Sequence, residues 1–117
     1  MSRKERVASA IKKETCDILL REVSDPRIGF VSITDVTVGD DLKLATIFVS
    51  IMGDENAKKE AMRGLKSASR RIRYFLGLRI DLKTVPDIVF KLDGSIERGS
   101  KIFSIMNTLR KENEKRV

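Results

Sequence analysis

The segment spanning residues 57–76 constrains the fold most, because it carries two chemically opposite faces at helical spacing. With successive residues turned by about 100°, its apolar side chains share an arc of about 100°; they are Ala57, Ala61, Leu65, Ala68, Ile72, Phe75 and Leu76. An arc of about 80° on the opposite side holds only cations, namely Lys59, Arg63, Lys66, Arg70 and Arg73. A helix of this kind buries one side only, so we expect it to lie on a sheet with its basic side in solvent.

The ends of two helices can be predicted from the residues that cap them. Asp54 is the expected N-cap of the helix just described, and Gly77 is expected to end it. Ser2 followed by Glu5 is a capping-box pattern, which predicts an earlier helix that reaches about residue 22. The stretch Ser24-Asp25-Pro26-Arg27 then ends this helix, because proline disfavours the α conformation in the residue before it.

Three short segments have the composition of β-strands. Residues 30–38 and 42–51 alternate apolar and polar side chains on either side of the turn Gly39-Asp40-Asp41, which predicts an antiparallel hairpin. The alternation slips between Ile33 and Val36, and we predict a β-bulge near Thr34-Asp35. A third strand is predicted over residues 87–92, and a last helix over residues 102–109.

This order of elements predicts one α+β domain over residues 1–109, followed by a short charged tail over residues 110–117. A helix, two strands, a long helix, a strand and a C-terminal helix suit a three-stranded mixed sheet covered by helices. The longest apolar stretch, residues 44–52, is too short to cross a bilayer. The charged N-terminus leads into no apolar signal-peptide core, so we expect a cytoplasmic protein with no membrane partner.

Composition excludes most catalytic and metal-binding chemistry. The chain has 117 residues and no histidine, which removes imidazole bases and histidine metal ligands. Cys16 is the single cysteine, so the chain forms no internal disulfide, as suits a reducing compartment. Residues 94–101 resemble a phosphate-binding P-loop, but serine and lysine are exchanged relative to that motif. We therefore expect no enzyme activity, no catalytic residue, no cofactor and no metal site.

The positive charge is concentrated in one part of the chain. The formal net charge is +7, and residues 58–79 contain eight cations with Glu60 as their one acid. Residues 14–57, in contrast, carry nine acids and three cations. A solvated helix face normally mixes both signs, so the basic face favours a polyanion over bare solvent. Nucleic acid is favoured over a membrane, because the apolar side of the helix should pack on the sheet. The alternative function is a protein–protein adaptor that docks an acidic partner on the same basic helix.

Phosphate contacts from the helix face are the predicted mode of RNA binding. Five phenylalanines and one tyrosine are too few for a stacking platform, and no two glycines have the spacing of a GXXG loop. The main candidates for phosphate contacts are Lys59, Arg63, Lys66, Arg70, Arg71 and Arg73. Secondary candidates are Arg79, Arg27, Arg3, Lys4 and Arg6. For Arg27, an ion pair with a nearby acid is an equally good interpretation.

An ordered set of short motifs resembles the ribosome-binding factor A family from about residue 3 to residue 109. The motifs are Arg6-Val7-Ala8, Asp25-Pro26-Arg27-Ile28-Gly29, Ile33-Thr34-Asp35-Val36, Asp41-Leu42 with Ala45 and Val49-Ser50, Ile72-Arg73, and Pro86-Asp87-Ile88-Val89-Phe90 with Asp93. The resemblance implies a type II KH-like fold whose second helix is kinked. It also implies a bacterial cytoplasmic assembly factor that binds the immature 30S ribosomal subunit and assists late maturation of 16S rRNA. Such factors matter most in the cold and are released with help from a ribosome-assembly GTPase.

The chain departs from the family pattern at the kink. The family carries an Ala-x-Gly element there in place of the KH loop, whereas the matching residues here are Ala68-Ser69-Arg70. An arginine therefore replaces the glycine at the place where the family would meet RNA. The tail after Leu109 is brief. Because the basic face argues against self-association through that surface, we expect a monomer.

Overall fold

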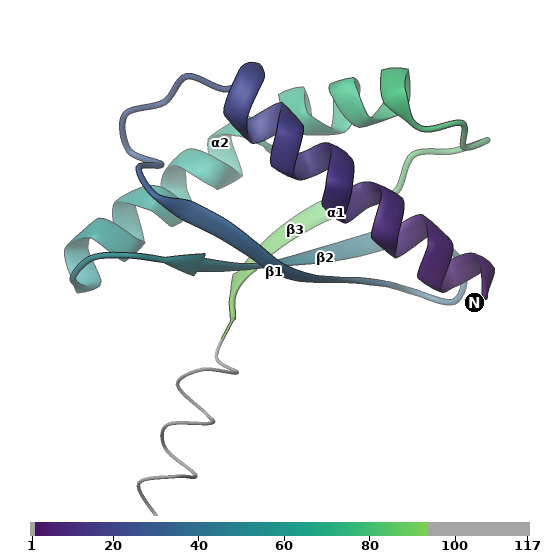
Figure 1. Cartoon of the computed structure of the whole chain (residues 1–117), viewed down its shortest axis with the longest axis horizontal. Coiled ribbons are helices and arrows are strands. Elements are labelled where there is room, and N and C mark those ends of the chain that lie inside the picture. The colour runs from purple at the N-terminus through teal and green to yellow at the C-terminus, as the bar shows by residue number, and fades with distance from the viewer. Residues whose placement is uncertain (1, 94–117) are drawn as a thin grey trace, which may run out of the picture.

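The computed structural model describes residues 2–93, which form two helices and three strands in the expected order (Figure 1). The elements are α1 (Arg3–Arg21), β1 (Val31–Val38), β2 (Leu44–Ile51), α2 (Glu55–Arg79) and β3 (Asp87–Leu92). The α+β fold class is confirmed. The helix predicted over residues 102–109 and the tail that follows it lie outside the described residues.

The three strands form one mixed sheet in the order β1-β2-β3. β1 and β2 pair antiparallel, and the register shifts between Ile33 and Asp35, which confirms the predicted bulge. β2 and β3 run parallel. Parallel neighbours need a long crossover connection, and α2 supplies it. Because β2 is central, β3 keeps one free edge within residues 2–93, and α2 packs along β3.

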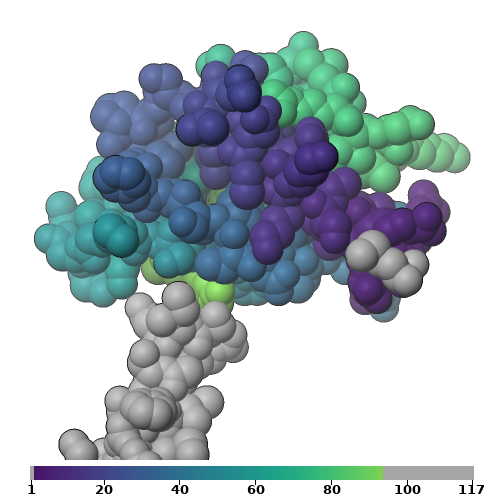
Figure 2. Space-filling view, in the orientation of Figure 1, coloured from purple at the N-terminus to yellow at the C-terminus, as the bar shows by residue number. Residues whose placement is uncertain are grey.

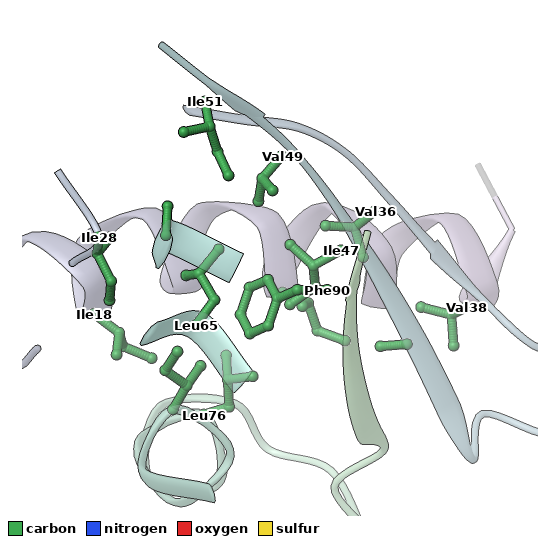
Figure 3. Close-up of a cluster of buried hydrophobic side chains, with 14 of the residues drawn as sticks. Ile18, Ile28, Val36, Val38, Ile47, Val49, Ile51, Leu65, Leu76 and Phe90 are labelled. Atoms are coloured by element: carbon green, nitrogen blue, oxygen red, sulfur yellow. The ribbon is translucent and has the colours of Figure 1, made fainter. Parts of the chain in front are cut away.

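Both helices pack on the same face of the sheet (Figure 1). α1 lies over β1, α2 lies over β3, and the two helices also contact each other. The core between the layers is aliphatic apart from Phe90 (Figure 3). Its most deeply buried side chains come from both helices and from the central strand, and they include Ile11, Ile18, Ile47, Val49, Leu65, Ile72 and Leu76. The apolar arc predicted for residues 57–76 is therefore the buried side of α2.

Both predicted N-caps are present. Ser2 Oγ accepts a hydrogen bond from the amide of Glu5 at 3.1 Å. Asp54 Oδ1 accepts one from the amide of Ala57 at 2.8 Å. Each contact satisfies an amide that the first turn of a helix leaves without an internal partner.

Two predicted element ends are wrong. Gly77 does not end α2, which continues to Arg79 and is capped by Ile80. Gly77 lacks the positive φ of a helix-ending glycine. Its missing side chain instead leaves room for the segment before β3, because a Cβ on Gly77 would lie 3.2 Å from Val85 Cγ2. The second strand begins at Leu44 rather than at Leu42, because Leu42 has a left-handed φ of 59° that no strand accommodates.

α2 passes through Ala68-Ser69-Arg70 as one continuous helix. Figure 1 shows it changing direction where it passes behind α1. Ser69 Oγ donates a hydrogen bond to the carbonyl of Leu65 at 3.0 Å. A serine that bonds back to the preceding turn often bends a helix. Ser69 therefore gives this position a cause of bending that does not depend on the family's glycine.

Candidate nucleic-acid interface

The exposed side of α2 carries four cations in a line, which we call the basic stripe: Lys59, Arg63, Lys66 and Arg70. All four are exposed, on the side of the helix opposite to the buried Ala61, Leu65 and Ile72. Within residues 2–93, Lys59, Lys66 and Arg70 make no ion pair or side-chain hydrogen bond. Arg63 pairs with Glu60 at 2.8 Å, and its side chain is still 68% exposed. The stripe therefore offers cations that an external anion can reach.

A shallow groove adjoins the basic stripe. It has a volume of about 430 Å³ and lies between α2 and the free-edge strand β3. Arg63 and Lys66 line one side, while Ile88, Val89 and Phe90 form the other. These β3 residues were not among the predicted site residues, because only the crossover through α2 places β3 beside the stripe.

Arg73 is held by the protein itself. Its Nη2 donates to the carbonyl of Val85 at 2.8 Å, and its Nε donates to the carbonyl of Pro86 at 3.1 Å. Nε also lies 3.6 Å from a carboxylate oxygen of Asp87. These contacts join α2 to the segment that enters β3. The structure therefore gives Arg73 an internal role at the edge of the stripe, and a phosphate contact stays a prediction.

Arg79 faces α1 rather than the basic stripe. Its guanidinium donates a hydrogen bond to Asp17 and lies 3.9 Å from Glu14 and 3.7 Å from Glu22. The hydrogen bond from Arg79, followed by the one from Arg21, lowers the pKa of Asp17. The same pairing raises the pKa of Arg79. Helical periodicity places residue 79 on the apolar side of α2, which explains why it meets α1.

Arg71 also lies off the basic stripe. Its guanidinium carbon is 5.8 Å from the centre of the Phe75 ring, a cation–π distance. The side chain is exposed and borders a hollow with Val23 and Asp25 at the end of α1. Arg71 is thus accessible, but on another side of α2 from Arg70.

Arg27 is fixed by an ion pair with Asp25. Its Nη2 donates to Asp25 Oδ2 at 2.7 Å, and its Nε donates to Oδ1 at 3.0 Å. The hydrogen bonds from Arg27 lower the pKa of Asp25. The structure therefore supports the interpretation that Arg27 forms an ion pair with a nearby acid.

The three N-terminal candidates lie away from the stripe, beside the β1–β2 turn (Figure 1). Lys4 Nζ pairs with Asp40 in that turn at 2.8 Å, and this contact lowers the pKa of Asp40. Arg3 and Arg6 are exposed on the first turns of α1. These cations form a second basic area rather than an extension of the stripe.

Residues 2–93 contain no group of three or more Cys, Asp or Glu side chains placed to hold a metal ion. Among these residues, neither α1 nor α2 is long and apolar enough to cross a membrane.

The family described as ribosome-binding factor A matches residues 3–106. A ribosome-binding factor A from Halothermothrix orenii is 46% identical over 112 residues, which cover 96% of this chain and 92% of that protein. One from Brevibacillus brevis is 49% identical over 110 residues, which cover 94% of this chain and 91% of that protein.

Solved structures have the same fold. The solution structure of a Thermotoga maritima protein assigned to ribosome-binding factor A has a TM-score of 0.69 at 32% identity, over 81% of this chain and 91% of that one. A homology model of the Thermus thermophilus ribosome-binding factor A, as fitted into the cryo-EM map of its complex with the 30S subunit, has a TM-score of 0.58 at 21% identity. It covers 79% of this chain and 92% of that one.

Proposed function

This chain belongs to the ribosome-binding factor A family, and we propose that it binds the immature 30S ribosomal subunit as a non-enzymatic assembly factor. It assists late maturation of 16S rRNA in the cytoplasm. The choice of partner is supported by the family name and by the 30S complex of the Thermus thermophilus protein, which shares this fold. The observation that carries the mode of binding is the basic stripe, three of whose cations have no partner in residues 2–93.

The spacing of the basic stripe suits a phosphate backbone. Lys59 and Arg70 lie eleven positions apart on one helix, which corresponds to about 16 Å at the rise of an α-helix. That span covers several consecutive phosphates of a nucleic-acid strand. Each phosphate that a cation neutralises releases condensed counterions, which favours binding at low salt. Contacts of this kind set orientation and affinity rather than sequence preference.

The groove beside the stripe adds a place for an unpaired nucleotide. Its β3 side is apolar, with Val89 39% exposed, and its α2 side carries the cations Arg63 and Lys66. A base splayed out of a helix can rest on apolar side chains while its phosphate meets a cation. Among the described residues, Phe90, which is 9% exposed, provides the one aromatic ring that lines this groove. We therefore expect recognition of rRNA shape and backbone, with little base stacking.

The biological setting is part of the same proposal; family membership supports it, and the basic face, which argues against self-association through that surface, supports a monomer. The protein acts as a monomer, matters most in the cold, and leaves the subunit with help from a ribosome-assembly GTPase. It uses no cofactor.

Co-sedimentation with isolated small-subunit precursors tests the site. We expect the double variant Lys66→Glu/Arg70→Glu to lose association, because both cations face solvent and support no internal contact. The variant Lys43→Glu/Lys83→Glu makes the same change in net charge at exposed positions off the stripe, and it should still sediment with the subunit. Equal sedimentation of both variants would contradict the assignment of the basic stripe.

Nuclease treatment separates this function from that of an adaptor. If the stripe binds rRNA, a partner captured from cell extract through α2 is lost after digestion of RNA. If the stripe docks an acidic protein, the partner survives digestion.

A further inference from the structure

A separate surface lies at the end of the molecule where α1 and β2 end and where β1 and α2 begin (Figures 1 and 2). Three large apolar side chains there face solvent: Phe30 is 83% exposed, and Leu20 and Met52 are each 80% exposed. The amide of Met52 donates to the carbonyl of Phe30 at 3.3 Å, which joins two of the segments. We call these three residues the apolar ridge. Isolated exposed apolar residues are common, but a contiguous group marks a binding surface.

Phe30 stands between two hollows. One has a volume of about 550 Å³ and is lined by Leu19 and Leu20 of α1 together with Phe30 and Val31. The other has a volume of about 420 Å³ and brings Met52 and Ala57 to the other side of Phe30. A partner can therefore place an apolar side chain against either side of the ring.

The loop that carries Phe30 is built to hold it outward. Ile28, two positions earlier, is only 8% exposed and packs against Gly64 of α2. A Cβ on Gly64 would lie 2.8 Å from Ile28 Cγ1, so the glycine is needed for this contact. Arg27 is tied to Asp25, and Gly29 adopts a φ of 53° that reverses the chain after Ile28. Because the loop is anchored on both sides, the exposure of Phe30 is a consequence of its fixed geometry.

The charges around the apolar ridge favour a basic partner. Arg21 is paired with Asp17, and Arg27 with Asp25, each at 2.7 Å. Glu60 lines one hollow, and Asp54 follows Met52 closely in the chain. Glu55 follows Asp54, and its side chain is 88% exposed. The carboxylates of Asp17, Asp25 and Glu60 are paired with arginines in turn, so the carboxylates open to a partner are those of Asp54 and Glu55. A phosphate backbone would be repelled by these two groups, whereas a lysine- or arginine-rich segment finds complementary charge.

We propose that the apolar ridge docks a basic protein segment, which inserts an apolar side chain beside Phe30 and places its cations over the surrounding carboxylates. This interaction goes beyond the proposed RNA binding, because it gives the molecule a protein-binding surface separate from the basic stripe. A factor with both surfaces holds rRNA through one and a basic protein through the other.

The first test uses the full chain and a synthetic peptide of alternating leucine and lysine, followed by NMR of the backbone amides. We expect signals of residues 28–32 and 51–53 to shift. The variant Phe30→Ser/Met52→Ser should bind the peptide about tenfold more weakly. Leu44→Ser removes an exposed apolar side chain at the other end of β2 and should leave the affinity unchanged. Equal affinities for all three proteins, or shifts elsewhere only, would overturn the proposal. So would shifts of the ridge signals on titration with single-stranded octauridine.

The second test places a photoreactive benzophenone amino acid at position 30 or, as a control, at position 44, and irradiates the protein on small-subunit precursors. This test rests on the proposed function, because it seeks the partner on the subunit. We expect position 30 to crosslink to a basic protein and position 44 not to do so. Crosslinks from position 30 to rRNA, to a second copy of the chain, or to nothing in a complex that still sediments would overturn the proposal. Failure to sediment counts against the proposed function alone. The peptide titration then decides whether the apolar ridge binds a basic segment.

Discussion

Arg79, in the last turn of α2, donates a hydrogen bond to Asp17 of α1, 62 positions earlier in the chain. The same carboxylate also accepts a hydrogen bond from Arg21 at 2.7 Å. Asp17 therefore joins the end of the basic helix to the acidic side of α1. One of the cations that give residues 58–79 their high charge thus stabilises the packing of the two helices.

The contact between Arg79 and Asp17 should make the stability of the fold depend on pH in the acid range. The pKa of Asp17 is lowered in the folded protein, first by Arg79 and then by Arg21. Its carboxylate therefore stabilises the fold at pH values above about 3.9, the pKa of aspartate in an unfolded chain. This stability is lost as the pH falls through the lower pKa that Asp17 has in the folded protein. We expect Asp17→Asn to lower the Tm at pH 6 and the difference from the parent protein to shrink below about pH 4. Thermal unfolding followed by circular dichroism from pH 6 to pH 2 measures this; a difference independent of pH would contradict it.

Gly64 should resist replacement by alanine, although alanine is the better helix former. The new Cβ would lie 2.8 Å from Ile28 Cγ1 in the core. Overpacking typically costs about 1–3 kcal/mol, against a gain of about 1 kcal/mol in helix propensity. We expect Gly64→Ala to lower the free energy of unfolding by about 1 kcal/mol. Gly77→Ala is the matched control, because the one close contact of its Cβ among the described residues would be Val85 Cγ2 at 3.2 Å, and we expect it to cost less stability than Gly64→Ala. Urea denaturation compares the two; the opposite order would show that Ile28 moves aside.

Arg70 and Arg73 should respond in opposite ways to truncation. Arg73 donates to two backbone carbonyls before β3, so we expect Arg73→Ala to lower the free energy of unfolding by about 1 kcal/mol. Arg70 makes no such contact among the described residues and faces solvent; Arg70→Ala should keep the stability and weaken binding to subunit precursors. Denaturation and co-sedimentation of both variants check the contrast. A stable Arg73→Ala variant with lost binding would place Arg73 in the RNA interface instead.

The salt dependence of binding should report the number of phosphates at the basic stripe. Each neutralised phosphate contributes about −0.7 to −0.9 to the slope of log K against log salt concentration. The variant Lys59→Gln/Lys66→Gln/Arg70→Gln should therefore make the slope shallower by about 2. Binding to subunit precursors at several potassium chloride concentrations gives both slopes. An unchanged slope with lower affinity would mean that these side chains act on the fold.

Thr15 offers a route to a more stable protein. Its side chain is fully buried in α1, and its Oγ1 has no hydrogen-bond partner within the described chain. A buried hydroxyl without a partner is destabilising, so we expect Thr15→Val to raise the free energy of unfolding by about 1 kcal/mol. Thr15→Ser keeps the hydroxyl and removes the methyl group, and it should lower the stability by about the same amount. Urea denaturation of both variants distinguishes the two effects; stabilisation by serine would refute the assignment.

Short-range signals were sufficient for most element boundaries. The caps Ser2 and Asp54 lie within three residues of the amides they satisfy, and the bulge near Thr34-Asp35 follows from the parity of neighbouring side chains. Of the two errors, the one at Leu42 came from a local turn conformation, and the one at Gly77 from a contact over a longer distance. Gly77 lies inside α2 and leaves room for Val85 beside the helix, and the residue type alone does not distinguish a helix end from a close contact.

The candidate site likewise has features that neighbouring residues predict and features that depend on distant segments. The apolar and the basic side of α2 can be read from the residue order alone, because helical periodicity places each side chain around the axis regardless of what surrounds it. Which cations remain available depends on the tertiary contacts. Arg79 meets the carboxylates of α1, Arg73 meets the carbonyls before β3, and Arg27 is held by Asp25, whereas Lys59, Lys66 and Arg70 face solvent. The tertiary structure also brought Leu20, Phe30 and Met52 together, because α1, β1 and β2 end or begin at the same place. The physical reason is that charge and periodicity are local properties, while pairing and exposure depend on which distant segments the fold brings into contact.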